Sequence, residues 1–293
     1  MSAGSDSKPV DCIIQADNLA LLGRLPDEHC DLIYIDPPFH TGRKLSGNGK
    51  GPHAYDDRFA GGRDGYLSFL RPRLVEMKRV LSPRGTLYIH LDYRSVHYVK
   101  VMLDEVFGER SLLNEIIWSY RTGGRAGPRF ARKHDTILSY VKNPGSHTFH
   151  PLRGGAYRTD GLRWDDVGRP FKTTRHGRLY FDPQGPALTD VWEIPFLSTV
   201  SAERTGFPTQ KPLELLRRIV RASSNAGDLV ADFFCGSGTT LVAACLEQRR
   251  WLGCDIAPKT VALARRRIKQ TQVGCFVATP APPRGPSGPQ PHA

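Results

Sequence analysis

The sequence has few features of membrane, secreted or metal-binding proteins. None of its segments approaches the roughly 20 consecutive apolar residues needed to span a bilayer. The polar N-terminus lacks the apolar stretch of a secretory signal. The six cysteines are scattered, with no C-x-x-C pair and no Cys/His cluster at metal-ligand spacing. We therefore expect reduced thiols, no metal site, no membrane partner and a cytoplasmic location.

Acidic residues are scarce relative to basic ones. Lysine and arginine number 41 against 29 aspartates and glutamates, which gives a formal net charge of +12. An excess of this size favours a polyanionic partner, because each phosphate contact releases counterions. Many basic proteins bind no nucleic acid, so charge alone indicates a preference and does not identify the partner.

Two common nucleotide-binding signatures are also missing. A glycine-rich turn is present at Gly236 and Gly238, but Leu241 stands where a dinucleotide motif needs its third glycine. A P-loop would need Gly-Lys-Ser/Thr, which is absent as well. These absences argue against a nicotinamide oxidoreductase and against a phosphate-binding P-loop.

What the sequence does contain is an alternation of apolar strands and helical stripes. This rhythm predicts an α/β fold with a mostly parallel sheet and helices on both faces. Within the second helix, Pro72 predicts a kink or a late start. Strands are expected at 10–16, 31–35, 85–91, 114–120, 136–141, 228–234 and 251–256, and helices at 19–25, 66–81, 96–106, 213–220, 240–248 and 259–268.

Two segments depart from this rhythm. Residues 146–204 form an irregular, turn-rich stretch, which predicts a small inserted lobe between the two parts of one domain, 10–145 and 205–272. Its tryptophans, Trp164 and Trp192, are interpreted as core residues of that lobe and not as base contacts. The Pro/Gly-rich stretch 273–293 predicts a disordered tail.

The first chemical motif lies where the strand at 228–234 turns into a helix. Its glycines allow close approach of a ligand, and the helix N-terminus offers free N–H groups to a carboxylate. Asp232 before the glycines suits a cationic sulfonium better than a pyrophosphate, and Asp255 at the end of the next strand suits ribose hydroxyls. The motif therefore predicts an S-adenosylmethionine site, with a ligand-free tight turn as the alternative. Its residues are Asp232, Phe233, Phe234, Cys235, Gly236, Ser237, Gly238, Thr239 and Thr240.

The second motif follows the apolar strand at 31–35 and consists of Asp36, Pro37, Pro38 and Phe39. The prolines fix the backbone and remove two N–H donors, so the Asp36 carboxylate and the Pro37 carbonyl can accept both hydrogens of an exocyclic amino group. That arrangement would aim the nitrogen at a methyl donor by positioning alone. Phe39 offers a face on which an extruded base can stack. The alternative is a Pro-Pro strand terminator with a core phenylalanine.

These motifs and their order resemble the β-class of bacterial amino-methylating DNA methyltransferases, including the modification subunits of type III restriction systems. The D-P-P-F motif comes first, then the variable lobe, then T-Q-K-P at residues 209–212, and the glycine turn last. The resemblance implies a Rossmann-like S-adenosylmethionine-dependent methyltransferase fold, circularly permuted, with residues 146–204 as an inserted target-recognition lobe.

The resemblance also implies roles for individual residues. Asp36 to Phe39 would form the catalytic loop, with Asp36 also touching the cofactor, and the glycine turn would hold the methionine part. Asp255 would bind the ribose, and residues 133–143 would form a framework strand. A mobile loop at 40–59 would close over DNA, with Arg43 and Lys44 as DNA contacts. Further cofactor contacts would come from Asp17 and Asn18 near the adenine ring and from Thr209, Gln210, Lys211 and Pro212.

The sequence departs from the family in informative ways. Phe39 stands where most relatives have tyrosine, and the chain is much shorter than a type III modification subunit. Relatives that methylate cytosine N4 usually carry serine at the Asp36 position, so aspartate favours N6 of adenine in double-stranded DNA. Cytosine N4, an RNA amino group and a catalytically silent DNA-binding module stay as alternatives. A homodimer and a cognate restriction endonuclease are left open.

A basic loop at 121–133 combines arginines with glycines and contains no acid. This composition favours DNA contacts over a merely solvated loop. Cys235, inside the glycine turn, is interpreted as a small apolar residue and not as a nucleophile, since no activating base is evident beside it. The DNA contacts predicted in the loop are Arg121, Arg125, Arg129, Arg132 and Lys133.

Overall fold

The computed structural model describes residues 9–41, 44–46, 54–120, 127–157, 160–198 and 200–277. A central eight-stranded sheet forms the middle layer. Neighbouring strands are parallel, except that β7 is antiparallel to both β5 and β6. In sheet order the strands are β1 (Cys12–Gln15), β13 (Arg250–Asp255), β12 (Leu229–Asp232), β2 (Cys30–Ile35), β5 (Leu81–Leu91), β7 (His134–Val141), β6 (Leu112–Ser119) and β11 (Val191–Glu193).

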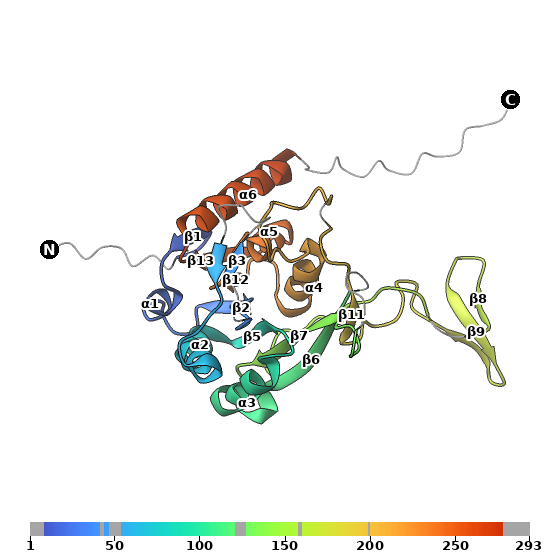
Figure 1. Ribbon diagram of the computed structural model, residues 1–293. Helices are drawn as coiled ribbons and strands as arrows, with labels where there is room; N and C mark the ends of the chain where they lie inside the picture. Colours follow the sequence, from blue (N-terminus) through green and yellow to red (C-terminus); the bar gives the residue numbers. More distant parts are fainter. Residues whose placement is uncertain are drawn as a thin grey trace.

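Helices cover both faces of this sheet (Figure 1). One face packs against α1 (Asn18–Leu22), α2 (Gly62–Val80) and α3 (Val96–Phe107), and the other against α4 (Leu213–Ser223), α5 (Thr239–Leu246) and α6 (Pro258–Val277). Successive strand residues alternate between the two cores, because side chains along a strand point to opposite faces. In β2, Ile33 and Ile35 enter the first core while Leu32 and Tyr34 enter the second. The predicted α/β architecture is confirmed.

The position of β12 decides where the chemistry lies. Although β12 comes late in the chain, it pairs in parallel with β2, with Val230 opposite Leu32 and Ala231 opposite Ile33. The carboxyl ends of parallel neighbours meet at one edge of a sheet. The D-P-P-F motif that follows β2 and the glycine turn that follows β12 are therefore neighbours in space.

Several elements differ from the sequence-based expectations. Helix α2 begins at Gly62 and continues through Pro72, so the predicted late start is wrong. Proline removes one backbone bond, but the buried side chains of Leu70 and Leu74 hold the helix against the sheet. Two three-residue strands, β3 (Lys44–Ser46) and β4 (Ala54–Asp56), pair within the segment expected to be a loop, because such short strands leave no periodic signal. Helix α6 continues to Val277, beyond the start of the predicted tail at residue 273.

The predicted lobe contains a three-stranded antiparallel sheet made of β8 (Leu162–Trp164), β9 (Pro170–Thr174) and β10 (Gly177–Tyr180). Outside the lobe, a short 3-10 helix, η2 (Glu109–Ser111), precedes β6. Figure 1 shows β8 and β9 projecting away from the central sheet. Trp164 is 64% exposed, so its assignment to a core is wrong, because the edge strand β8 leaves that side chain uncovered. Trp192 is buried, but in the main core, since β11 pairs with β6.

Membrane-spanning helices and metal-binding clusters are both missing from the described residues. Within them, no helix combines the length and the apolar character needed to cross a bilayer. The same ranges contain no cluster of three or more histidine, cysteine, aspartate or glutamate side chains arranged to hold a metal ion.

Candidate active site

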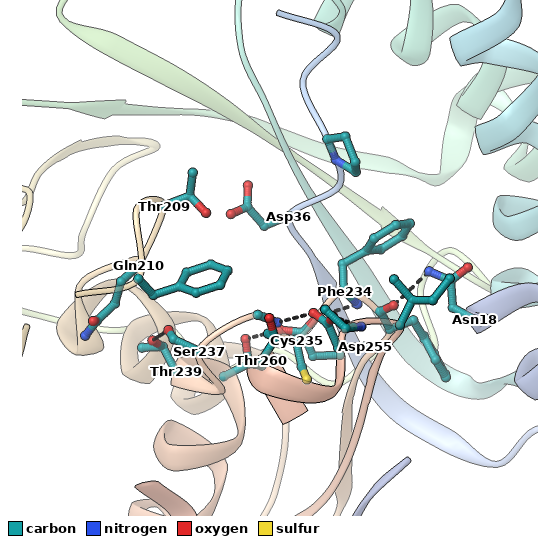
Figure 2. Close-up of a pocket in the computed structure, with 18 of the residues that line it drawn as sticks. Asn18, Asp36, Thr209, Gln210, Phe234, Cys235, Ser237, Thr239, Asp255 and Thr260 are labelled. Atoms are coloured by element: carbon teal, nitrogen blue, oxygen red, sulfur yellow. Dashed lines mark hydrogen bonds between the residues drawn. The ribbon is translucent and has the colours of Figure 1, made fainter. Parts of the chain in front are cut away.

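A cavity of about 700 Å³ opens at the sheet edge where β1, β13, β12 and β2 end (Figure 2). Its walls come from the start of α1, the end of β2 and the residues after it, the glycine turn, the loop after β13 and the segment 207–211 before α4, with Phe69 of α2 and Leu216 of α4. Figure 2 shows Asp36 and Thr209 at one end of the cavity and Asn18 at the other. Parallel strands explain this convergence, since their carboxyl ends share one edge.

The glycine turn after β12 is closed by its own hydrogen bonds. The Thr240 hydroxyl donates to Asp232 Oδ2 at 2.5 Å, and the Phe234 N–H donates to Asp232 Oδ1 at 3.0 Å. Gly236 and Gly238 have φ of 49° and 78°, in the left-handed region that favours glycine. A Cβ on Gly236 would also lie 3.1 Å from the Phe207 ring. The turn thus needs glycine both for its backbone and for close approach.

Asp255 ties the end of β13 to this turn. Its Oδ2 accepts from the Gly236 N–H at 3.1 Å, and its Oδ1 accepts from the Ala257 N–H at 2.9 Å. Each carboxylate oxygen keeps a second lone pair for another donor. Because Asp255 lines the cavity, it can accept hydrogen bonds from a ligand diol. Burial raises the pKa of Asp255, and it raises the pKa of Asp232 to about 7.

A buried arginine organises the opposite end of the cavity. Arg73 on α2 donates to Asn18 Oδ1 at 2.6 Å and to Asp17 Oδ2 at 2.8 Å. The Asn18 amide donates in turn to the Phe233 carbonyl at 2.8 Å, and the guanidinium lies 3.7 Å from the Phe69 ring centroid. Sequence reasoning found Asp17 and Asn18 but missed Arg73, because a lone arginine on an amphipathic helix resembles any solvated one.

The segment before α4 is fixed by Gln210. The Thr205 N–H and the Thr205 hydroxyl donate to its Oε1 at 2.8 and 2.7 Å, and its Nε2 donates to the Glu203 carbonyl at 2.7 Å. Figure 2 shows the Gln210 amide directed away from Asp36. This side chain therefore stabilises the segment that carries Thr209 and Lys211 into the cavity wall.

The D-P-P-F motif directly follows β2, and its aspartate forms an ion pair with Lys211. Lys211 Nζ lies 2.5 Å from Asp36 Oδ2, and both side chains are largely buried. The other oxygen, Oδ1, is buried and has no hydrogen-bond partner within the described part of the chain. Since buried acceptors normally have partners, Oδ1 is an acceptor that a ligand at the cavity can satisfy. Lys211 also lies 5.2 Å from the centroid of the Phe39 ring.

Beneath Phe39 lies a buried polar group that the sequence did not reveal. The His90 ring is 5.7 Å from the Phe39 ring, and His90 Nδ1 lies 2.9 Å from the Tyr34 hydroxyl. His90 Nε2 lies 3.3 Å from Asp135 Oδ2. Burial lowers the pKa of His90, and nearby Lys211 lowers it further, so the imidazole is neutral near pH 7. These residues lie on three neighbouring strands, which no local spacing could reveal.

Most of the predicted cofactor residues do meet in one place. Those that do not line the cavity shape it through the backbone: Pro212 begins α4 and Gly238 begins α5. Burial raises the pKa of the Cys235 thiol well above its ordinary value, which agrees with a small apolar role. The predicted residues that line the cavity are Asp17, Asn18, Asp36, Thr209, Gln210, Lys211, Asp232, Phe233, Phe234, Cys235, Gly236, Ser237, Thr239, Thr240 and Asp255, joined by Pro38 of the D-P-P-F motif.

The predicted DNA contacts are less completely described. Arg129 and Arg132 are exposed, and the Arg132 guanidinium lies 3.6 Å from the centroid of the Tyr93 ring. Arg94 lies 4.8 Å from the same ring, just beyond the end of β5 and hence at the sheet edge that carries the D-P-P-F motif. Lys133 is half-buried. Arg43, Arg121 and Arg125 lie outside the described residues, and Lys44 is described only as part of β3.

The donor set fits S-adenosylmethionine. The cavity has acidic groups at Asp232 and Asp255 for a cation and a ribose, and aromatic side chains at Phe69 and Phe234. At Gly236 the absence of a Cβ leaves room beside the Phe207 ring, another residue of the cavity wall. Asp36 also lines this cavity, and its buried Oδ1 keeps the capacity to accept a hydrogen bond from an amino group that reaches it.

Comparisons with known proteins agree with this geometry. Residues 30–266 match a family model described as DNA methylase. The chain is 31% identical to the type II methyltransferase M.EcaI of Enterobacter cloacae, over 91% of this chain and 71% of that protein. It is 29% identical to the DNA adenine methyltransferase YhdJ of Escherichia coli, over 87% of this chain and 82% of that protein.

Solved structures share the fold. The M1.HpyAVI–SAM complex superposes with a TM-score of 0.58 at 20% identity, covering 87% of this chain and 98% of that one. The cytosine-N4-specific PvuII DNA methyltransferase gives a TM-score of 0.59 at 17% identity, covering 91% and 92%. Taken with the site and the family match, they lead to one assignment: the chain belongs to the DNA methylase family and is an S-adenosylmethionine-dependent DNA methyltransferase.

Proposed function

We propose that this enzyme methylates N6 of adenine at a specific sequence in double-stranded DNA. The observation that carries the proposal is the Asp36 carboxylate: Asp36 lines the cavity, and its Oδ1 is buried with no hydrogen-bond partner among the residues that the structure describes. An exocyclic amino group supplies the hydrogen-bond donor that this oxygen lacks. Aspartate at this position favours adenine over cytosine, and one relative of similar length is named a DNA adenine methyltransferase.

In this proposal the chain acts by positioning. Asp36 Oδ1 and the Pro37 carbonyl accept the two amino hydrogens, which reduces conjugation of the nitrogen lone pair with the base ring. Phe39, supported by His90, offers its ring to the base. The target nitrogen is inaccessible inside a duplex, so the base must leave the helix before it reaches Asp36. Bound S-adenosylmethionine supplies the methyl group.

The remaining cavity residues hold the cofactor. Asp255 accepts from the ribose hydroxyls, and Asn18, fixed by Arg73, borders the adenine ring. The N-terminus of α5 with Thr239 and Thr240 offers donors to the methionine carboxylate. Asp232, buried beneath the turn, provides a negative charge for the sulfonium when it is ionised.

DNA contacts are assigned to the exposed side of the same edge. We assign the exposed Arg129 and Arg132 to phosphate contacts, and the small sheet whose strands β8 and β9 project from the central sheet (Figure 1) to the flanking duplex. A homodimer and a cognate restriction endonuclease stay as predictions.

The test is to identify the methylated nucleoside. Purified protein is incubated with methyl-labelled S-adenosylmethionine and unmethylated genomic DNA, and the DNA is digested to nucleosides. We expect the label in N6-methyladenine. Label in N4-methylcytosine would keep the mechanism and change the base, whereas absence of label from DNA despite cofactor binding would overturn the proposal.

A further inference from the structure

Lys211 forms an ion pair with Asp36, whereas the family resemblance implies that Lys211 contacts the cofactor. Its ammonium is 2.5 Å from Asp36 Oδ2, and the side chains of Lys211 and Asp36 are 11% and 16% exposed. A pair buried to this degree is poorly screened by solvent. The contact therefore restrains the Asp36 side chain far more than a surface ion pair would.

The contact makes the two carboxylate oxygens different. Oδ2 is paired with the ammonium, while Oδ1 is buried and no described residue hydrogen-bonds to it. A carboxylate free to rotate could present either oxygen, or neither, to an incoming amino group. With Oδ2 held, Oδ1 becomes the acceptor that remains for a ligand in the cavity.

Hydrogen bonds of neighbouring residues fix the backbone that carries Lys211. Gln210 is bonded to Thr205 and to the Glu203 carbonyl, and Glu203 Oε1 accepts from the Leu213 N–H at 2.8 Å. These bonds fix the backbone on both sides of Lys211. The ammonium also lies 5.2 Å from the Phe39 ring centroid, so one cation contacts both functional side chains of the loop.

We propose that Lys211 is a positioning residue for methyl transfer: it holds Asp36 through Oδ2, so that Oδ1 is the oxygen that accepts from the target amino group. This inference rests on the proposed function, because it assigns the substrate's amino group to one atom. A displacement of about 1 Å at a reacting centre can lower a rate about 100-fold. Loss of the ammonium should therefore reduce the rate of the chemical step and not cofactor affinity.

The experiment compares Lys211→Met with Lys211→Arg in the full-length protein. S-adenosylmethionine affinity is measured by calorimetry, and methyl transfer to saturating DNA is measured under single-turnover conditions. We expect Lys211→Met to lower the single-turnover rate by about 100-fold while the cofactor Kd changes less than about threefold. Lys211→Arg, which keeps a cation beside Asp36, should recover most of the rate. Lys269→Met, on the exposed face of α6, is the control for loss of one positive charge.

The possible outcomes distinguish a failure of the role assigned to Lys211 from a failure of the proposed function. Retained cofactor affinity in Lys211→Met shows that the variant is folded. A weakened Kd with an unchanged rate would overturn the inference and make Lys211 a cofactor ligand. An unchanged rate with an unchanged Kd would also overturn it, while wild-type transfer to DNA would leave the proposed function intact. No transfer by the wild type would overturn both.

Discussion

The polar side chains at the two ends of the cavity differ in whether their hydrogen bonds are satisfied within the protein. At the adenosine end, the side chains of Asp17 and Asn18 hydrogen-bond to the protein itself, as does that of Asp255. At the end that carries the D-P-P-F motif, Asp36 Oδ1 is buried and has no hydrogen-bond partner in the described ranges. An unsatisfied buried acceptor costs about 1–3 kcal/mol. Under the proposed function, this difference means that the end assigned to adenosine is preorganised, while the end with Asp36 keeps one acceptor for the substrate.

The largest expected effect comes from removing that acceptor. Asp36→Ala should lower methyl transfer to DNA by at least about 100-fold, since loss of one preorganised group at a reacting centre has an effect of about 10²–10³. The cofactor Kd should change little, because Asp36 contributes only one group at the cavity wall. Radiolabel transfer and calorimetry on the same preparation measure both. A fully active variant would remove Asp36 from the mechanism.

The adenosine end should show the opposite behaviour. Arg73→Met removes the donors that hold Asn18 and Asp17, so the cofactor Kd should rise about 10-fold, with a lower midpoint of thermal unfolding. The single-turnover rate at saturating cofactor should stay within about threefold of wild type. The matched control is Arg71→Met, an exposed arginine of the same helix paired with Glu105. If Arg73→Met changed the rate and left Kd unaltered, the comparison of the two ends would fail.

Asp232 links cofactor binding to pH. Burial raises its pKa from 3.8 to about 7, so part of the apo protein carries a neutral Asp232 near neutrality. A cationic cofactor favours the ionised form, so affinity should increase about 10-fold between about pH 6 and pH 8. Calorimetry in buffers of different ionisation enthalpy should detect proton release on binding. Asp232→Asn should abolish that release, and persistence of proton release in the variant would assign it to another group.

The same pKa shift predicts a stability effect with a defined sign. The folded-state pKa of Asp232 is raised, so the folded apo protein binds the proton more tightly than the unfolded chain does. Its contribution to the free energy of unfolding is present below about pH 4 and is lost as pH rises through about 7. Chemical denaturation of wild type and Asp232→Asn across this range checks the sign.

The smallest effect is expected at the DNA-facing edge. Arg94 and Arg132 both lie over the Tyr93 ring, which follows β5 at the sheet edge that carries the D-P-P-F motif. Tyr93→Leu should weaken DNA binding about threefold, whereas Tyr93→Phe keeps the ring face and should bind normally. Arg132→Ala should make the dependence of log affinity on log salt shallower by about 0.9. Arg110→Ala, an exposed arginine in η2, is the control. Equal binding by the leucine and phenylalanine variants would contradict the role of the ring.

Local sequence patterns carried much of the fold and part of the site. Strand β2 could be predicted because a strand buried on both faces leaves a continuous run of apolar residues. Helices α3 and α4 could be predicted because a helix buried on one face repeats its apolar residues with the helical period. The glycines at 236 and 238 were informative because only glycine tolerates that backbone and its contacts. The misassigned Trp164 shows the limit of this approach, since side-chain exposure depends on what packs against a strand.

The sequence by itself determined the order of the motifs, the α/β rhythm and the chemistry that aspartate, proline and glycine offer at 36–39 and 232–240. The tertiary structure alone decided that β12 lies beside β2, which brings those motifs together across about 200 residues of chain. It also decided that Lys211 binds Asp36 and that Arg73 holds Asn18. Local spacing encodes periodicity and turns, whereas pairing of distant side chains is set by how strands and helices pack, and no local pattern records it.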